Sequence, residues 1–295
     1  MHRRTLPLDV PLHVAEFGGA GRPIVLVHGL GGSHVNWISV GDRLTPHGHV
    51  TAIDLIGHGY TPRDGAEAKV PQHRELLEHY LQRLDQPAVL VGNSMGGFLA
   101  LTVAASAPRL VAGLVLVGAA LPREHVVPRD PLIAGLFGLY LIPGLARRFL
   151  RARDRRLGPE GVVEQVLDLC TVDAARIDDE AWDAHVQMAR ERYWMSASRS
   201  SFLQSTRSLT PRLVSRKRAV DMIAEIEAPA LIVHGDRDRL VPVEVARHLA
   251  EQRPDWQLEV IDDIGHVPQL EAPDRFLEVV GPWLEQLADS QAAED

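Results

Sequence analysis

A serine in a position to act as a nucleophile lies in the segment GNSMGG, residues 92–97. An apolar run, AVLV, precedes this segment and a helical pattern follows it, which is the strand–turn–helix context that a nucleophile elbow requires. Gly92 and Gly96 are needed in such a turn because a Cβ there would collide with the neighbouring strand and helix. The Ser94 hydroxyl would then lie at the N-terminus of a helix, whose dipole favours developing negative charge. The segment therefore predicts a nucleophilic Ser94; the alternative is a chance match in a loop that opens a helix.

A glycine-rich segment, HGLGG at residues 28–32, directly follows the apolar strand pattern IVLV. A turn of this kind can aim a backbone N–H at the predicted elbow. We expect the Leu30 and Met95 amides to form an oxyanion hole, in which each donor is worth roughly 10²–10³ in rate. His28 and Gly29 are expected to support the loop, with His28 held by a backbone hydrogen bond rather than acting in catalysis.

Two later segments offer an acid and a base. The first, GDRDRLVP at residues 235–242, contains Asp236 and Asp238, and the second, DDIGH at residues 262–266, ends in His266. The chain order of serine, aspartate and histidine fits a Ser-His-Asp triad. Because each segment follows a strand pattern, the three groups can meet at the carboxyl edge of one parallel sheet. The spacing alone leaves both aspartates open as the acid.

The elements that must position these residues alternate along the chain. Short apolar runs predict strands at residues 12–17, 24–28, 50–54, 88–92, 113–117, 229–234 and 257–261, and helical periodicity covers residues 71–84, 94–106, 243–252 and 272–288. Several of the runs are apolar throughout, as in parallel strands that are covered by helices on both faces. The pattern predicts an α/β fold with a mostly parallel central sheet.

The alternation fails between residues 122 and 215, where helical patterns occur without a convincing strand. We interpret residues 122–215 as a helical cap that is inserted into a core formed by residues 1–121 and 216–295. Residues 122–228 contain 17 basic and 15 acidic side chains, whereas the rest of the chain contains 14 and 24. The predicted cap is therefore slightly basic on an acidic protein.

The composition argues against several kinds of function. The net charge of −8 argues against nucleic-acid binding, because phosphate contacts need a basic face. The single cysteine, Cys170, rules out an internal disulfide and favours the reducing cytoplasm. The N-terminus lacks the apolar stretch of a signal peptide, and the longest apolar segment, residues 132–146, is too short to span a membrane. We expect a soluble, cytoplasmic protein without stable membrane insertion, without a metal site and without an organic cofactor.

The elbow, the HGLGG loop and the segments GDRDRLVP and GHVPQLEAP together resemble the α/β-hydrolase superfamily across nearly the whole chain outside the predicted cap. The subgroup is similar to capped esterases and to hydrolases of meta-ring-fission products. In such proteins the acid lies at the fourth position of a G-x-x-D-x-x-x-P stretch, which implies Asp238, with Asp236 as the second choice. The resemblance implies acyl transfer, in which His266 takes the Ser94 proton and Asp238 orients the imidazole.

The expected activity is that of a serine carboxylesterase or lipase-like hydrolase acting on a small hydrophobic ester. One alternative is hydrolysis of a carbon–carbon bond in ring-fission diketones, because hydrolases of that kind share the elbow sequence GNSMGG. They usually carry a Gly-Pro-Gly turn and a tryptophan after the catalytic histidine, whereas this chain has Gly31-Gly32-Ser33 and Val267. The other alternative is a non-enzymatic, ligand-sensing homologue, since a fold alone does not settle function. The oligomeric state stays open.

Substrate choice is expected to lie in the predicted cap. Residues 132–142 are apolar on most faces, and an arginine-rich stretch follows at residues 147–153. This pair is either a lipid-facing lid with a basic collar or a helix pair packed on the sheet, and the second interpretation is favoured. A further cluster either lines an acyl pocket or forms the core of the cap itself: Trp182, Met188, Tyr193, Trp194, Met195 and Phe202.

Overall fold

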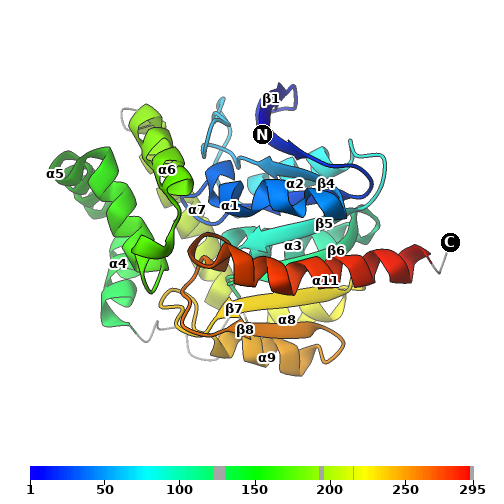
Figure 1. Ribbon diagram of the computed structural model, residues 1–295. Coiled ribbons are helices and arrows are strands. Elements are labelled where there is room, and N and C mark those ends of the chain that lie inside the picture. The colour runs from blue at the N-terminus through cyan, green and yellow to red at the C-terminus, as the bar shows by residue number, and fades with distance from the viewer. Residues whose placement is uncertain (122–129, 193–195, 215, 293–295) are drawn as a thin grey trace.

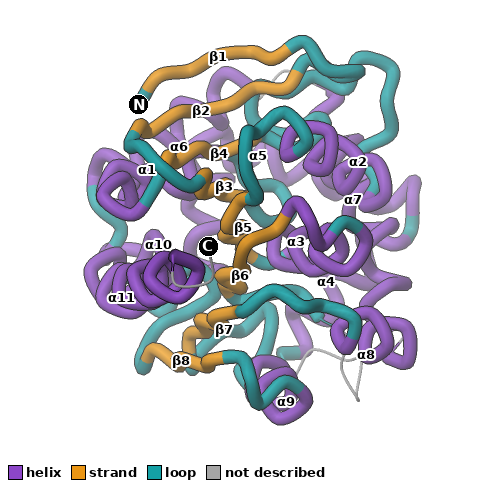
Figure 2. Tube along the Cα trace, turned by 90° about the vertical axis from the view of Figure 1, so that its right-hand side faces the viewer, coloured by secondary structure: helices purple, strands orange, loops and turns teal. Residues whose placement is uncertain are grey.

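An eight-stranded sheet runs through the computed structural model, which describes residues 1–121, 130–192, 196–214 and 216–292 (Figures 1 and 2). The strand order is β1-β2-β4-β3-β5-β6-β7-β8. The strands are β1 (His2–Leu6), β2 (Leu12–Gly18), β3 (Pro23–Val27), β4 (His49–Ile53), β5 (Ala88–Asn93), β6 (Val111–Val117), β7 (Ala230–Gly235) and β8 (Gln257–Ile261). Strands β3 to β8 are parallel, and β2 pairs antiparallel with both β1 and β4. The prediction of an α/β fold with a mostly parallel sheet is confirmed.

The centre of the sheet is apolar on both faces. Every residue of β3, β5, β6 and β7 is buried, as expected for parallel strands that have helices on both sides. Each of the seven predicted strands is present, with its ends within two residues of the predicted ones. The apolar runs were therefore sufficient to locate the part of the sheet that carries the site.

The edge strand β1 is the strand that the pattern analysis missed. Its sequence, HRRTL, has no apolar alternation, and four of its five residues are exposed. Backbone pairing with β2 and an ion pair between Arg4 and Glu16 hold it at the edge of the sheet. Because these contacts come from another strand, no local sequence signal could reveal it.

Helices cover the sheet in two layers, which Figure 2 shows on either side of the strands. One layer contains α1 (Ile38–Gly41) and α11 (Pro273–Ala292). The other layer contains α2 (Val70–Leu81), α3 (Met95–Ser106), α8 (Arg216–Ala224) and α9 (Glu244–Gln252). Each layer forms its own apolar core against one face of the sheet, so the strands that hold the site are fixed from both sides.

Helices fill the described part of the chain between β6 and β7, with no strand among them. They are α4 (Pro131–Leu141), α5 (Pro143–Cys170), α6 (Asp179–Arg192), α7 (Ser196–Val214) and α8. Helices α4, α5 and α6 lie at the left of the sheet in Figure 1. Helix α7 packs against α4 and α5 and also against α2, where the Ser205 hydroxyl lies 2.9 Å from His73 Nε2. The division into a core and a cap at residues 122 and 215 stays a prediction.

The close approach of α3 to β3 yields a prediction about stability. A Cβ built on Gly96 would lie 2.1 Å from the Val27 carbonyl oxygen, so Gly96→Ala must push the helix away from the strand. We expect this substitution to lower the free energy of unfolding by about 1–3 kcal/mol, as overpacking does. Chemical denaturation followed by circular dichroism measures the change.

The matched control is Gly135→Ala in α4, where an added Cβ would meet nothing within 4 Å. Alanine is the better helix former, so this variant should gain up to about 1 kcal/mol. Equal destabilisation by the two substitutions would contradict the proposed cause.

Candidate active site

Ser94 lies in a strained turn between β5 and α3. Its backbone angles are φ 54° and ψ −114°, a conformation that non-glycine residues rarely adopt. The turn is tight enough that a Cβ on Gly92 would lie 2.5 Å from the Gly96 carbonyl oxygen. The Ser94 amide donates to the Val117 carbonyl of β6 at 2.9 Å, which fixes the turn to the neighbouring strand. The structure thus places Ser94 at the N-terminal end of α3 in an elbow of the predicted kind.

The HGLGG loop packs directly on this elbow. A Cβ built on Gly29 would lie 3.0 Å from the Ser94 Cβ, so the next residue, Leu30, is also beside the turn. Met95 is the first residue of α3, and its N–H has no acceptor within the helix. Among the described residues, no hydrogen bond engages the Leu30 amide. Neither of the two amides that were predicted to form an oxyanion hole therefore donates a hydrogen bond within the described parts of the chain.

His28 lies beneath this loop and is fully buried. Its Nδ1 lies 2.7 Å from the Gly29 carbonyl oxygen, and its Nε2 accepts the Leu55 amide at 3.0 Å. Because one nitrogen faces an acceptor and the other a donor, the ring is neutral with the proton on Nδ1. The geometry is that of a support for the loop rather than of a catalytic base.

His266 contacts Asp238 and not Asp236. The distance from His266 Nδ1 to Asp238 Oδ2 is 2.6 Å, and both side chains are buried. Asp236 is exposed, and its carboxylate accepts the Ile264 amide at 3.4 Å, which joins two loops. The structure therefore brings the base together with the first-choice acid and gives the second choice a bracing role.

The Asp238 carboxylate is surrounded by donors. Its Oδ1 accepts the Leu240 and Val241 amides, each at 2.8 Å. His234 Nε2 lies 3.3 Å from Oδ2 and 2.7 Å from the Val241 carbonyl oxygen, so this nitrogen must carry a proton. Burial acts to raise the pKa of Asp238, but His266 and His234 outweigh it and hold the pKa well below its usual range. Asp238 is thus a permanent anion beside His266.

Backbone and amide contacts hold His266 against the elbow. The Asn93 carboxamide donates to the His266 carbonyl and to the Val117 carbonyl, each at 3.1 Å. The His266 amide donates to the carbonyl of Cys170, the last residue of α5, at 2.6 Å. No hydrogen bond joins the Ser94 hydroxyl to His266 in the described structure, and such bonds are often loose before substrate binds. The sequence analysis missed Asn93, although it lies inside the elbow motif.

Glu271 is a second residue that the sequence analysis missed. It is 2% exposed, and its Oε2 accepts the Gly265 amide at 2.7 Å. Its other oxygen accepts the amides of Val172 and Asp173, just after α5, at 2.8 and 3.0 Å. One buried carboxylate therefore ties the loop before His266 to the helical region. It lies in the segment GHVPQLEAP, where a carboxylate among apolar residues was the available signal.

The only cysteine in the sequence lies close to these carboxylates. Burial, together with the charges of Asp238 and Glu271, raises the pKa of the Cys170 thiol to about 12. A thiol with this pKa is protonated at neutral pH and is a poor nucleophile. The side chain therefore offers no competing nucleophile to Ser94.

A third buried carboxylate, Asp54, lies beside two histidines that the sequence analysis did not connect. His13 Nδ1 and His34 Nδ1 lie 2.9 and 3.0 Å from Asp54 Oδ2. The three ligand atoms lie within 4.8 Å of one another, a spacing that a metal ion could use. The carboxylate also accepts the His34 and Tyr60 amides at 2.7 and 2.8 Å. Internal hydrogen bonds thus satisfy Asp54, and the cluster braces the loops after β3 and β4.

The cluster predicted to line an acyl pocket is divided by the structure. Trp182 packs between α5 and α6 in an apolar group that includes Val267, the residue after His266. Phe202 packs with α4 and α5, and its ring carbon lies 3.3 Å from a Cβ built on Gly31. Met188 is buried on α6, and residues 193–195 lie outside the described parts of the chain. Phe202 is thus the member that borders the HGLGG loop.

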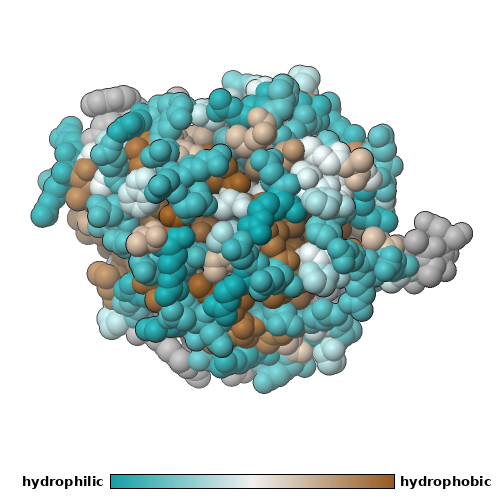
Figure 3. Space-filling view, in the orientation of Figure 1, coloured by the Kyte–Doolittle hydropathy of each residue, from teal (hydrophilic) through white to brown (hydrophobic). Residues whose placement is uncertain are grey.

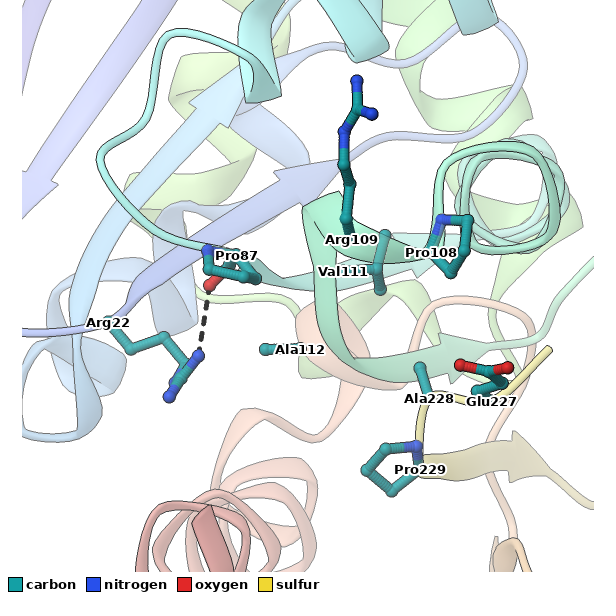
Figure 4. Close-up of a pocket in the computed structure, with 9 residues that line it drawn as sticks. All are labelled: Arg22, Pro87, Pro108, Arg109, Val111, Ala112, Glu227, Ala228 and Pro229. Atoms are coloured by element: carbon teal, nitrogen blue, oxygen red, sulfur yellow. Dashed lines mark hydrogen bonds between the residues drawn. The ribbon is translucent and has the colours of Figure 1, made fainter. Parts of the chain in front are cut away.

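A surface pocket of about 530 Å³ lies away from this site (Figure 4). Residues at the amino ends of β3, β5, β6 and β7 line it, among them Arg22, Pro87, Val111 and Pro229. Ser94, Asp238 and His266 follow the carboxyl ends of β5, β7 and β8, at the edge where ligands of open α/β sheets bind. The pocket is therefore on the opposite edge of the sheet from the candidate active site.

Three buried histidines near the HGLGG loop give a prediction about acid stability. Burial lowers the pKa of His28 to about 4 and that of His73 to about 3, and holds the pKa of His58 well below its ordinary value. The unfolded chain protonates these rings near pH 6.5. It therefore binds more protons than the folded protein below that pH, so stability is complete above pH 6.5 and decreases towards pH 3–4. For His28 alone the loss is on the order of 3 kcal/mol.

Urea denaturation at several pH values measures this dependence. His73→Asn should reduce the slope of stability against pH between 6.5 and 3, whereas His79→Asn, an exposed position on the same helix, should leave the slope unchanged. A profile that is flat across this range would show that the buried histidines do not have lowered pKa values.

Comparison with known proteins places the chain in a family. The sequence model of the alpha/beta hydrolase fold matches residues 22–273. A 2-hydroxymuconate semialdehyde hydrolase of Pseudomonas sp. strain CF600 is 31% identical over 93% of this chain and 90% of its own length. A 2-hydroxy-6-oxo-2,4-heptadienoate hydrolase of Pseudomonas putida is 31% identical over 90% of each. The solved structure of a serine hydrolase involved in carbazole degradation, the CarC enzyme, superposes with a TM-score of 0.72 at 24% identity, covering 97% of this chain and 99% of that one. The chain therefore belongs to the α/β-hydrolase fold family, close to its hydrolases of meta-cleavage products.

Proposed function

We propose that this protein is a serine-dependent hydrolase that cleaves a carbon–carbon bond in a ring-fission diketone. The observation that carries a hydrolytic function is the buried 2.6 Å contact between His266 and Asp238 beside the strained turn of Ser94. The relatives named for 2-hydroxymuconate semialdehyde and 2-hydroxy-6-oxo-2,4-heptadienoate favour carbon–carbon cleavage over ester cleavage. The elbow sequence GNSMGG, which the chain shares with such hydrolases, also supports carbon–carbon cleavage.

The proposed reaction needs a base, a nucleophile and a proton donor. His266 removes the Ser94 proton, and the Ser94 oxygen attacks the ketone carbonyl that flanks the bond to be broken. The carbon–carbon bond breaks, and its electron pair is delocalised through the neighbouring C=C bond onto the oxygen of the second ketone. That oxygen takes the proton from the His266 imidazolium, which gives the dienol. Water, activated by His266, then releases the acyl group as a carboxylic acid. One water is consumed, and the products are a carboxylic acid and a dienol acid.

Charge that develops during this reaction has partners on the protein. The oxyanion formed at the carbonyl would lie against the Leu30 and Met95 amides, for which the described structure shows no other acceptor. The imidazolium that forms on His266 is stabilised by the permanent anion Asp238. Ester hydrolysis would use the same groups in the same roles, so the triad by itself does not select between the two bonds.

Ester hydrolysis is the second candidate, because a specific feature favours it. Val267 packs in an apolar cluster with Leu270 and α5, where ring-fission hydrolases usually have a tryptophan. The turn Gly31-Gly32-Ser33 also differs from the usual Gly-Pro-Gly. These two departures lie beside the oxyanion amides and the base, where they would change the fit of a substrate. The similarity to ring-fission hydrolases covers about nine-tenths of both relatives and outweighs these two departures, so carbon–carbon cleavage stays the first proposal.

The helices between β6 and β7 are proposed to select the substrate as a cap. The HGLGG loop contacts Phe202 of α7, and the His266 amide bonds to the end of α5. The Phe202 side chain thus borders the loop that carries the Leu30 amide, and the backbone at the end of α5 borders His266. We therefore expect the core to carry out the chemistry and these helices to determine which substrate is accepted.

The first test compares two substrate classes on wild type and Ser94→Ala. The ring-fission product of catechol or 3-methylcatechol, made with an extradiol dioxygenase, is coloured, and its loss is followed by absorbance. A p-nitrophenyl ester series from acetate to palmitate is assayed in parallel. We expect kcat/KM for the ring-fission product to exceed that for the esters, and Ser94→Ala to lower it by roughly 10⁴-fold or more.

Ser106→Ala, at the other end of α3, is the matched control and should retain activity. Activity on esters but not on ring-fission products would replace the proposed substrate with the second candidate. A stable, folded wild type that cleaves neither class would favour the ligand-sensing alternative.

A second prediction separates the two aspartates. Asp238→Asn would remove the anion that orients His266, so kcat should decrease by roughly 10⁴-fold with little change in KM. Asp236→Asn keeps an acceptor for the Ile264 amide and should lower kcat less than tenfold. Steady-state kinetics on the better substrate of the first test gives both values. Similar losses in the two variants would contradict the assignment of Asp238 as the acid.

A further inference from the structure

Large apolar side chains are exposed mainly in one region of the described structure. Six such side chains are exposed by more than two-fifths, and five of them lie on α4, α5 and the residue between: Leu132, Leu141, Ile142, Leu145 and Val166. Four of these five lie within residues 132–145, which form the corner where α4 meets α5. We call residues 131–158 the α4–α5 corner. An exposed cluster of this kind marks a surface that meets an apolar partner.

The two helices of the corner each turn one face away from the protein. On α4, Ile133 and Tyr140 are buried, while Leu132 and Leu141 point outward. The outward face also carries Gly135 and Gly138, at which an added Cβ would meet nothing within 4 Å. On α5, residues 146, 150 and 154 are buried, and Leu145 lies outside that stripe. The apolar surface is therefore an outer face of folded helices and not a frayed segment.

Positive charge surrounds this apolar face. The α4–α5 corner contains six arginines and one acidic residue, whereas the whole chain has a net charge of −8. The acidic residue, Asp154, is buried and paired with Arg153 and Arg199. The other five arginines are exposed: Arg147, Arg148, Arg151, Arg155 and Arg156. None of these five forms an ion pair within the described parts of the chain.

The shape of the corner fits a surface contact rather than a membrane crossing. No single described helix is long and apolar enough to span a membrane, although α4 and α5 together pass that test as a pair bent by 117°. The eleven residues of α4 extend only about 16 Å, roughly half of a bilayer core. A helix of that length, apolar outside and followed by arginines, can lie in the plane of a lipid headgroup layer.

We propose that the α4–α5 corner docks the protein on an anionic lipid bilayer. The leucines and Ile142 would enter the boundary between headgroups and acyl chains, and the five exposed arginines would meet lipid phosphates. A second copy of the chain is a poorer occupant, because a symmetric contact would bring the two sets of arginines together. Figure 3 shows hydrophobic atoms at the left edge of the molecule, beside strongly hydrophilic ones, where Figure 1 places α4 and α5.

The corner is also contiguous with the candidate active site. On its inner side, the Tyr140 ring packs edge-on against Phe202 at 5.1 Å, and Phe202 borders Gly31 of the HGLGG loop. At the start of α4, Asp130 forms a 2.7 Å ion pair with Arg239, the neighbour of Asp238. A bilayer bound at the corner would therefore lie on the side of the molecule that carries the HGLGG loop and Asp238. The docking itself does not depend on the proposed reaction.

Vesicle co-sedimentation tests this proposal with the full chain. Wild type is mixed with vesicles of phosphatidylcholine alone or with added phosphatidylglycerol, and the bound fraction is measured at several salt concentrations. We expect binding to the phosphatidylglycerol vesicles that weakens as salt rises. Arg148→Ser with Arg151→Ser should weaken it roughly fivefold for each arginine. Leu141→Ser with Leu145→Ser should weaken it roughly tenfold for each leucine.

Matched controls separate the corner from the rest of the surface. Val166→Ser removes an exposed apolar side chain elsewhere on α5, and Arg247→Ser removes an exposed arginine of α9; both should bind as wild type does. Denaturation curves and activity towards a soluble substrate report whether each variant is folded. Equal binding to both kinds of vesicle, or variants of the corner that bind as wild type, would overturn the proposal. If wild type does not bind vesicles but forms a dimer that Leu145→Ser disrupts, the lipid proposal is wrong and a second copy of the chain occupies the α4–α5 corner.

Discussion

The buried carboxylate of Asp238 is the constraint on which the site depends. A charge removed from water must be compensated by donors at fixed positions, and here two backbone amides and two histidines supply them. The loop after β7 can meet this requirement only if it closes around Asp238. The loop after β8 must then bring His266 to within 2.6 Å of the same carboxylate. One desolvated charge thus determines the shape of two loops and the orientation of the base.

Two further buried carboxylates also need hydrogen-bond donors at fixed positions. Asp54 accepts hydrogen bonds from the loop after β3, which contains the HGLGG segment, and from the loop after β4. Glu271 joins the loop before His266 to the start of the chain segment after α5. Each would be costly to bury alone, and each is satisfied by donors from distant parts of the sequence. The result is a rigid edge of the sheet, against which the strained turn of Ser94 can be maintained.

The residues proposed for the chemistry and those proposed for substrate choice come from different parts of the chain. Ser94, His266 and Asp238, the proposed nucleophile, base and acid, each follow a core strand, and the sheet fixes the spacing of these strands. Ester and carbon–carbon cleavage both require a serine attack on a carbonyl, an oxyanion site and a proton donor for the leaving group. They differ in the groups that border the leaving atom, and we propose that helices α4 to α7 and Val267 supply those groups here. The relatives therefore add information about substrate that the triad geometry does not contain.

The sequence by itself determined seven of the eight strands, the turn at Ser94 and the order of the predicted triad residues, because apolar runs and glycine turns are local signals. It also narrowed the acid to Asp236 or Asp238, which share one loop. Only the tertiary structure decided that Asp238 faces His266, since the two are 28 residues apart in the chain. The same holds for β1, for Glu271 and for the histidines around Asp54. Their roles depend on partners from other elements, and burial and pairing between distant residues leave no pattern in a single local segment.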